Sequence, residues 1–223
     1  MRIMLFAIGV ALMLFPTTVS AQTAETELPR FQQVSERLYR GAQPRAGGVQ
    51  RLRELGIDTI VNLRGSGELT RAEEAEARAL GLNYFNVPLP NWGRPQDDRV
   101  RRILLIIAAP QNGRVFVHCK DGVDRTGTIV ALYRIGQQHW STNDALAEAE
   151  RLGMRRSQFW MRDYTEDYGR RTQTGDYQSS DFDDRIGTSM RIVEQETSRA
   201  RKISVHVLSK VPGKVSGFLG SIF

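Results

Sequence analysis

The chain has 223 residues, of which 40% are hydrophobic and 25% are charged, and its formal net charge is +6. This composition is typical of a folded protein and excludes a chain that is disordered throughout. The length accommodates one ordinary domain with extensions. The positive charge is spread mainly as arginine, without a basic motif or aromatic platforms, so no nucleic-acid partner is predicted.

The first 21 residues are predicted to be a signal peptide. Arg2 gives a positive start, the run Ile3 to Phe15 is nearly all apolar, and Val19-Ser20-Ala21 offers a small-residue cleavage site. The apolar run is short for a membrane span, although an uncleaved anchor stays open as the alternative. We therefore expect an exported protein, periplasmic or secreted, that is cleaved near Ala21.

From residue 28 to residue 170 the sequence alternates between predicted strands and helices. Runs of β-branched residues predict the strands, whereas stretches rich in Ala, Glu and Arg, several of them ended by glycine, predict the helices. In chain order we expect a strand at 37–40, a helix at 49–55, a strand at 57–63, a helix at 69–80, a strand at 83–89, a helix at 96–109, a strand at 115–117, and helices at 126–139, 141–152 and 157–170. This order predicts an α/β fold with a central, mostly parallel sheet of four to five strands flanked by helices.

The composition changes in the segment 171–223. Residues 172–190 are rich in Ser, Thr, Gly and Asp, which predicts a linker. Further on, apolar residues recur at helix-like spacing, at Leu208, Val211, Val215, Phe218 and Ile222. Three of the four lysines of the chain also lie in this tail, so a basic amphipathic helix would suit peripheral contact with a membrane. The proline and glycines within the tail favour the alternative, a disordered or self-docked segment.

Cys119 is the only cysteine of the chain and has no intramolecular disulfide partner. It follows the predicted strand 115–117 and His118, and five residues separate it from Arg125, which opens an apolar helix. A strand, a short loop and a helix in this order form a phosphate cradle, because loop N–H groups and the helix N-terminus converge on an anion. The alternative is a buried, inert cysteine. The predicted phosphate-binding positions are Lys120, Asp121, Gly122, Val123, Asp124, Arg125 and Thr126.

The residue types of this loop suit nucleophilic attack on a phosphate. A thiol ionises at about pH 8.5, and a helix end and a neighbouring cation favour its reactive thiolate. The planar fork of Arg125 matches two phosphate oxygens and can stabilise the transition state. Gly122 allows the backbone to approach the oxygens closely. We expect Thr126 to hydrogen-bond the sulfur of Cys119, and His118 to point away from the sulfur and bond loop carbonyls.

The segment His118-Cys119-x5-Arg125-Thr126-Gly127 resembles the H-C-x5-R-[ST]-G signature of the protein tyrosine and dual-specificity phosphatases. Residues 38–44 (LYRGAQP) and 56–64 (GIDTIVNLR) look like the opening strands of compact bacterial members and of atypical plant and fungal dual-specificity phosphatases. The resemblance covers about residues 28–168. It implies that Cys119 attacks phosphorus, that water hydrolyses the phosphocysteine, and that no metal or other cofactor takes part.

The resemblance also implies a general acid, whose identity the sequence leaves open. Many family members carry an Asp in a mobile loop before the cysteine, but here residues 86–92 contain no acid. Asp124 is the first candidate, because Asp121 and Asp124 match the two Asp residues in the C-x-D-G-x-D-R loop of myotubularins. A loop-stabilising carboxylate is the alternative role for Asp124. Asp97 and Asp98 are the other candidates, and both also suit the first turn of a helix.

A phosphatase without a strong acid, restricted to good leaving groups such as phenols, is the remaining interpretation. Three functions stay open at this point. The first is hydrolysis of phosphotyrosine or another phosphoprotein substrate. The second is hydrolysis of phosphoinositides or inositol phosphates, for which Lys120 supplies charge that Asp121 and Asp124 offset. The third is a non-catalytic phosphate-binding module. No metal site is predicted, because His139 and His206 stand isolated in the sequence.

Overall fold

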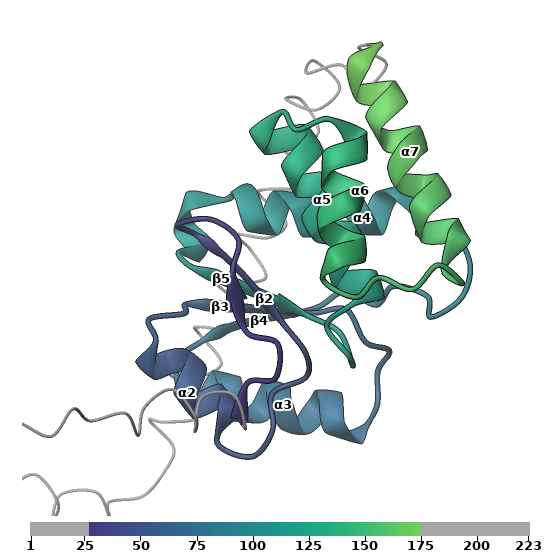
Figure 1. Ribbon diagram of the computed structural model, residues 1–223. Helices are drawn as coiled ribbons and strands as arrows, with labels where there is room; N and C mark the ends of the chain where they lie inside the picture. The colour runs from purple at the N-terminus through teal and green to yellow at the C-terminus, as the bar shows by residue number, and fades with distance from the viewer. Residues whose placement is uncertain (1–26, 175–223) are drawn as a thin grey trace, which may run out of the picture.

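The computed structural model describes residues 27–174. The predicted signal peptide and, from residue 175 onward, the predicted linker and tail lie outside this range. Within it, helices cover both faces of one mostly parallel five-stranded sheet (Figure 1). This arrangement confirms the predicted α/β fold.

The sheet places the strand that leads to Cys119 at its centre. The strand order is β1-β2-β5-β3-β4, and each neighbouring pair is parallel except β1 and β2. The strands are β1 (Gln32–Gln33), β2 (Leu38–Gly41), β3 (Thr59–Asn62), β4 (Asn83–Asn86) and β5 (Val115–His118). The sequence did not predict β1, because two exposed glutamines carry no strand pattern.

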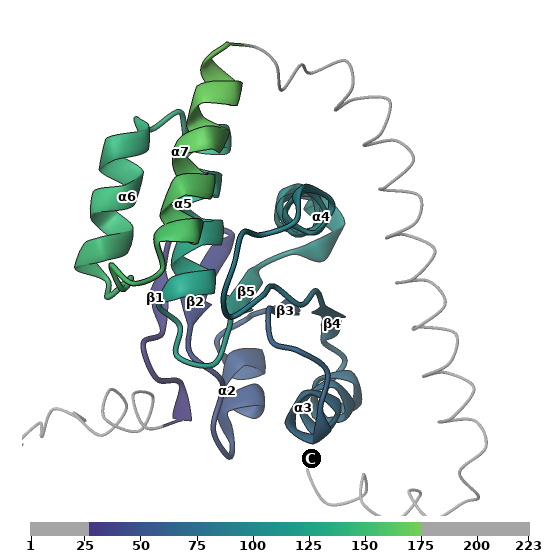
Figure 2. The same cartoon turned by 90° about the vertical axis from the view of Figure 1, so that its right-hand side faces the viewer.

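The helices form two layers (Figure 2). One face of the sheet carries α2 (Gly48–Glu54) and α3 (Glu68–Ala79), and the other carries α4 (Asp97–Ala108), α5 (Asp124–Gln138), α6 (Thr142–Arg151) and α7 (Phe159–Gln173). A short 3₁₀ turn, Pro110–Asn112, precedes β5. All the predicted helices are present with shifted ends; α5 starts at 124 rather than 126, because the loop after Cys119 is tighter than expected.

Two apolar clusters hold these layers together. One lies between the sheet and the helices α4, α5 and α7, and it includes Cys119. The other lies between the sheet and the helices α2 and α3. Strand β5 and residues 124–132 of α5 are buried throughout, so the loop between them is anchored in the core at both ends.

The parallel strands bring four loops to one edge of the sheet. Because β2, β3, β4 and β5 point the same way, residues 42–47, 63–67, 87–96 and 119–123 all leave from their carboxyl ends. Ligand sites of open α/β sheets form at this edge. None of the helices in residues 27–174 is both long and apolar enough for a membrane span.

Candidate active site

Cys119 and Arg125 are held at the ends of two core elements. Cys119 directly follows β5, is a free thiol and is 2% exposed. Arg125 lies in the first turn of α5 and is 9% exposed. Its Nη1 donates a hydrogen bond to the carbonyl oxygen of Leu63, just past the end of β3, at 3.2 Å. The guanidinium therefore turns inward, toward the sheet edge from which the loop after β5 also leaves.

The loop packs tightly against the end of β2. Gly122 has a φ of 71°, and a Cβ atom there would lie 2.6 Å from backbone atoms of Gly41 and Ala42. Nη2 of the buried Arg40 donates a 2.7 Å hydrogen bond to the carbonyl oxygen of Gly122. Burial lowers the pKa of Arg40, against the opposing charges of Glu148 and Cys119. No role for Arg40 is predicted from the sequence, although a charged residue inside a buried strand is a usable signal.

His118 connects the loop to α3. Its Nδ1 lies 3.1 Å from the carbonyl oxygen of Cys119, the loop-carbonyl contact that the sequence predicts. Its Nε2 lies 3.0 Å from Oε1 of Glu73, and both side chains are buried. A role for Glu73 is not predictable from the sequence, because this residue is one of several glutamates in an ordinary helix. This contact therefore joins β5 to α3 directly next to Cys119.

The other oxygen of the Glu73 carboxylate accepts two further hydrogen bonds. Nδ2 of Asn62 donates to Oε2 at 2.6 Å, and the hydroxyl of Tyr84 donates at 2.9 Å. Burial alone would raise the pKa of Glu73, but the hydrogen bond and charge of His118, together with the hydrogen bonds of Gln43 and Tyr84, lower it below 4.5. Burial and the Glu73 charge raise the pKa of Tyr84. The Glu73 carboxylate therefore stabilises the fold above pH 4.5, and this contribution is lost as pH falls through the lowered pKa.

Asp124 is bonded on both oxygens to Arg155, in the segment between α6 and α7. Its Oδ1 accepts from the backbone N–H of Arg155 at 2.9 Å. Its Oδ2 accepts from Nε at 2.8 Å and also from Nη2. These bonds and the charge of Asp124 raise the pKa of Arg155. The contacts favour the loop-stabilising role and oppose the first-choice assignment of Asp124 as general acid, because a proton there would break the ion pair with Arg155.

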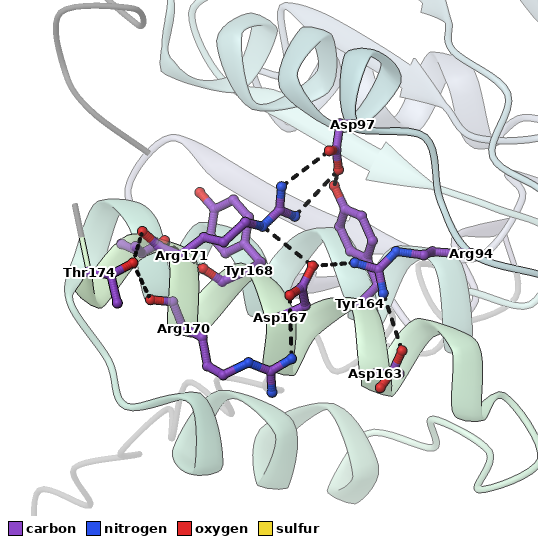
Figure 3. A network of polar contacts seen from close by, with 10 residues as sticks. Arg94, Asp97, Asp163, Tyr164, Asp167, Tyr168, Arg170, Arg171 and Thr174 are labelled. Atoms are coloured by element: carbon purple, nitrogen blue, oxygen red, sulfur yellow. Dashed lines mark hydrogen bonds and ion pairs between the residues drawn. The ribbon is translucent and has the colours of Figure 1, made fainter. Parts of the chain in front are cut away.

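Asp97 is also bonded, in this case to α7 (Figure 3). Tyr164 donates to its Oδ1 at 2.7 Å, and Arg171 pairs with its Oδ2 at 3.1 Å. Burial opposes the shift, but the bonds from Arg171 and Tyr164 lower the pKa of Asp97. Asp98 is exposed, and its carboxylate makes no hydrogen bond or ion pair to another side chain in the described range. Of the three candidate acids, Asp98 alone keeps both oxygens available.

Thr126 is fully buried in the first turn of α5. Its Oγ1 has no hydrogen-bond partner among residues 27–174. The expected hydrogen bond from Thr126 to the sulfur of Cys119 is therefore not made in this structure.

A pocket of about 680 Å³ opens beside the outer side of the loop. Three of the predicted phosphate-binding residues line it, namely Lys120, Asp121 and Val123. The lining contains five basic side chains and a single acidic one, with Arg30, Arg45, Arg64, Lys120 and Arg155 set against Asp121. The remaining predicted positions, Gly122, Asp124, Arg125 and Thr126, are buried behind this surface. Residues 27–174 contain no group of three His, Cys, Asp or Glu side chains arranged to hold a metal ion.

We predict that Gly122→Ala destabilises the fold by about 2 to 4 kcal/mol, since the new Cβ combines a positive φ with backbone clashes. Urea denaturation measures the change. Gly65→Ala is the matched control, because no atom lies within 4 Å of a Cβ built at that neighbouring loop position. Equal stabilities of the two variants would show that the loop accommodates a side chain.

A family model described as "DSP-PTPase phosphatase fused to NAD+ Kinase" matches residues 13–166 of the chain. The dual specificity protein phosphatase TpbA of Pseudomonas aeruginosa is 32% identical over 164 residues, which cover 69% of this chain and 72% of TpbA. The crystal structure of TpbA superposes with a TM-score of 0.53 at 28% identity, over 65% of this chain and 91% of that one.

The catalytic domain of the PP-IP phosphatase SIW14 from S. cerevisiae superposes with a TM-score of 0.59 over 68% of this chain and 92% of that one. At 21% identity this likeness shows the fold alone. The family match and the similarity to TpbA show the family as well as the fold. They argue against the interpretation as a non-catalytic phosphate-binding module. The chain belongs to the DSP-PTPase family of cysteine-dependent phosphatases and is a phosphoric monoester hydrolase.

Proposed function

We propose that the chain hydrolyses phosphotyrosine in proteins through a phosphocysteine on Cys119. The observation that carries this proposal is the loop between β5 and α5, which holds a lone thiol and an inward-turned guanidinium at the same sheet edge. The helix N-terminus and the loop amides favour an anion at this place. The cation of Arg125 favours the thiolate form of the nucleophile.

The proposed reaction has two steps. The Cys119 thiolate attacks phosphorus, an S–P bond forms, and the ester P–O bond breaks as its electron pair leaves with the substrate oxygen. Water then attacks the phosphocysteine, inorganic phosphate leaves, and the thiolate is regenerated. In both steps Arg125 binds two of the phosphoryl oxygens that do not react, where the charge of the transition state develops.

The bonded carboxylates favour an aryl ester as substrate. Asp124 is paired with Arg155, and Asp97 is paired with α7, so neither is set up to protonate a poor leaving group. A phenol leaves more readily than an alkyl alcohol, which makes phosphotyrosine the best-suited phosphoresidue. A Cys-to-Ser variant of TpbA, 27% identical to this chain, has been crystallised with phosphotyrosine, which supports this assignment.

Replacing the nucleophile tests the proposal. We predict that Cys119→Ser lowers the turnover of p-nitrophenyl phosphate by at least about a thousandfold, because the hydroxyl does not ionise at neutral pH. The variant is expected to keep its affinity for a phosphotyrosyl peptide, measured by calorimetry, since the cradle is intact. A variant that retains a substantial part of its turnover would rule out the phosphocysteine.

The leaving group tests the role of Asp124. Because this carboxylate braces the loop, we predict that Asp124→Asn lowers turnover by the same factor, about ten- to a hundredfold, on p-nitrophenyl phosphate and on an alkyl phosphate. Steady-state rates with both esters give the comparison. A much larger loss on the alkyl ester would restore Asp124 as the acid. Asp98→Asn with the same two esters provides the second arm, where a loss confined to the alkyl ester assigns the acid to Asp98.

The basic pocket favours a second candidate, hydrolysis of inositol phosphates or phosphoinositides. Its lining has an excess of four positive charges, five basic side chains against one acidic, directly beside the loop. Arg64 donates a hydrogen bond to Gln43, and Arg155 is paired with Asp124. These two of the five basic side chains are therefore held in position by neighbouring residues. A ligand with several phosphates gains more from such a field than a ligand with a single phosphate does.

We predict that Lys120→Gln combined with Arg64→Gln raises the KM for inositol hexakisphosphate about tenfold and changes that for p-nitrophenyl phosphate less than about twofold, because the pocket acts on the additional phosphates. Arg78→Gln is the matched control, since Arg78 lies on the surface of α3 and pairs with Glu74. Equal effects on both substrates would discard the polyphosphate candidate.

A further inference from the structure

Three strongly exposed apolar side chains lie at the edge of the sheet that carries Cys119. Leu69 and Trp92 are each 63% exposed, and Phe159 is 55% exposed. Leu69 lies in the first turn of α3, Trp92 in the loop after β4, and Phe159 at the start of α7. Large apolar side chains that gather on one part of a surface mark an interaction site, whereas singly scattered ones do not.

Two of these side chains meet on a shared aromatic ring. Trp92 packs edge-on against Trp160, with ring centroids 5.9 Å apart, and Phe159 packs against Trp160 at 3.8 Å. The segment before α7 is in turn fixed to the first turn of α5 by the bonds between Arg155 and Asp124. The aromatic cluster of Trp92, Phe159 and Trp160 therefore lies beside the loop between β5 and α5.

The basic pocket borders these apolar side chains. Leu69 and Arg155 both line the pocket, and Arg155 precedes Phe159 by four residues. Five segments of the chain meet at this edge, namely residues 42–47, 63–67, 87–96, 119–123 and 152–158. Together they contain six basic residues and one acidic residue. Of the carboxylates that begin the adjoining helices, Asp97 and Asp124 are paired with arginines, so the edge is positively charged.

The opposite edge of the sheet differs in both respects. Its connecting segments, residues 34–37, 55–58, 80–82, 109–114 and 139–141, contain two basic and two acidic residues. Among residues 27–174, Trp140 is the one strongly exposed large apolar side chain at that edge, and it is 37% exposed. The guanidinium of Arg134 lies over its ring, 4.4 Å from the centroid. Within the described residues, apolar exposure and positive charge therefore coincide at the edge of Cys119.

Exposed aromatic rings beside basic side chains suit the surface of an anionic membrane. Tryptophan and phenylalanine rings favour the boundary between headgroups and acyl chains, and basic side chains are attracted to anionic lipids. A second copy of the chain fits this surface less well, because two positively charged edges repel each other.

We propose that the edge of Cys119 docks on an anionic lipid surface. The aromatic cluster and Leu69 enter the headgroup region, and the side chains of the basic pocket bind lipid phosphates. Docking turns the loop between β5 and α5 toward the membrane. This role goes beyond the proposed reaction, because binding to the lipid surface needs no turnover.

The test places an environment-sensitive probe at single positions. Because Cys119 is the only cysteine of the chain, Cys119→Ser provides a background in which one added cysteine is labelled. The chain from residue 22 onward, the form expected after cleavage, carries Trp92→Cys or Leu69→Cys labelled with a nitrobenzoxadiazole dye. With vesicles of phosphatidylcholine and about one third phosphatidylglycerol, we expect the emission of either probe to rise at least about twofold. Trp140→Cys is the matched control, and its emission should change by less than about a fifth.

A second measurement gives the affinity without a probe. Trp92→Ala combined with Phe159→Ala removes two apolar side chains and should weaken co-sedimentation with these vesicles about tenfold. Trp140→Ala should agree with the unsubstituted chain within about twofold. Salt should weaken the binding, and vesicles of phosphatidylcholine alone should bind at least about tenfold more weakly.

Four results would each overturn the inference. Silent probes at positions 69 and 92, in a chain that still co-sediments, assign the membrane contact to another part, such as residues 175–223. Equal binding to neutral vesicles removes the role of the basic pocket. A raised KM for a phosphotyrosyl peptide in the double alanine variant, with unchanged vesicle binding, assigns the surface to a protein substrate. A dimer that this variant abolishes, without vesicle binding, assigns it to a second copy.

The probe measurement also stays independent of the proposed function. If Cys119→Ser retains hydrolysis, the phosphocysteine is wrong, yet the probes still report which edge faces the membrane. If Cys119→Ser is inactive and the probes are silent, the reaction stands and only the docking fails.

Discussion

The short loop between β5 and α5 depends on being held from several sides at once. A loop that gathers amides around an anion leaves those amides without partners inside the fold, so it gains little stability from its own hydrogen bonds. Its conformation must therefore be imposed by its neighbours. Arg40 binds the carbonyl oxygen of Gly122, His118 binds that of Cys119, and Arg155 binds Asp124. The braces come from β2, from the end of β5 supported by α3, and from the segment before α7.

Two of these braces also involve an ion pair, because His118 is paired with Glu73 and Asp124 with Arg155. Breaking one partner of a buried ion pair costs about 3 to 5 kcal/mol, because the other charge is left uncompensated. The pair of Glu73 and His118 is buried on both sides, whereas Arg155 is half exposed beside the buried Asp124. The first pair is thus expected to be the most costly to break, and it lies where α3 meets the central strand.

The sequence was sufficient to predict the fold and to single out a candidate loop, but not to predict the contacts that support this loop. The β-branched runs at 57–63 and 115–117 predicted buried parallel strands, and the thiol between such a strand and an apolar helix indicated the candidate site. The supports were not predictable, because they depend on contacts between segments far apart in the chain. In the sequence Glu73 is an ordinary helical glutamate. In the fold, β4 and β5 place Tyr84 and His118 in contact with it. Arg155 likewise acquires a role only because α6 returns the chain to Asp124.

The identity of the general acid could not be predicted from the sequence for a related reason. Sequence position places a carboxylate near the cysteine, but whether that carboxylate can carry a proton depends on its partners. Asp124 and Asp97 both use their oxygens to hold structural elements together, one at the loop and one at α7.

The segment before α4 is likewise held by contacts with other elements, in this case with α7. Arg94 pairs with Asp163 and Asp167, and Trp92 packs edge-on against Trp160, so the segment 90–97 is tied to α7 at several points. Exposed ion pairs contribute only about 0 to 1 kcal/mol each, so this attachment is the sum of weak contacts rather than one strong one. A segment held in this way, with its first carboxylate committed to Tyr164 and Arg171, is poorly suited to deliver a proton. Under the proposed function, discrimination between substrates then depends on how readily the substrate's leaving group departs and on the basic pocket beside the loop.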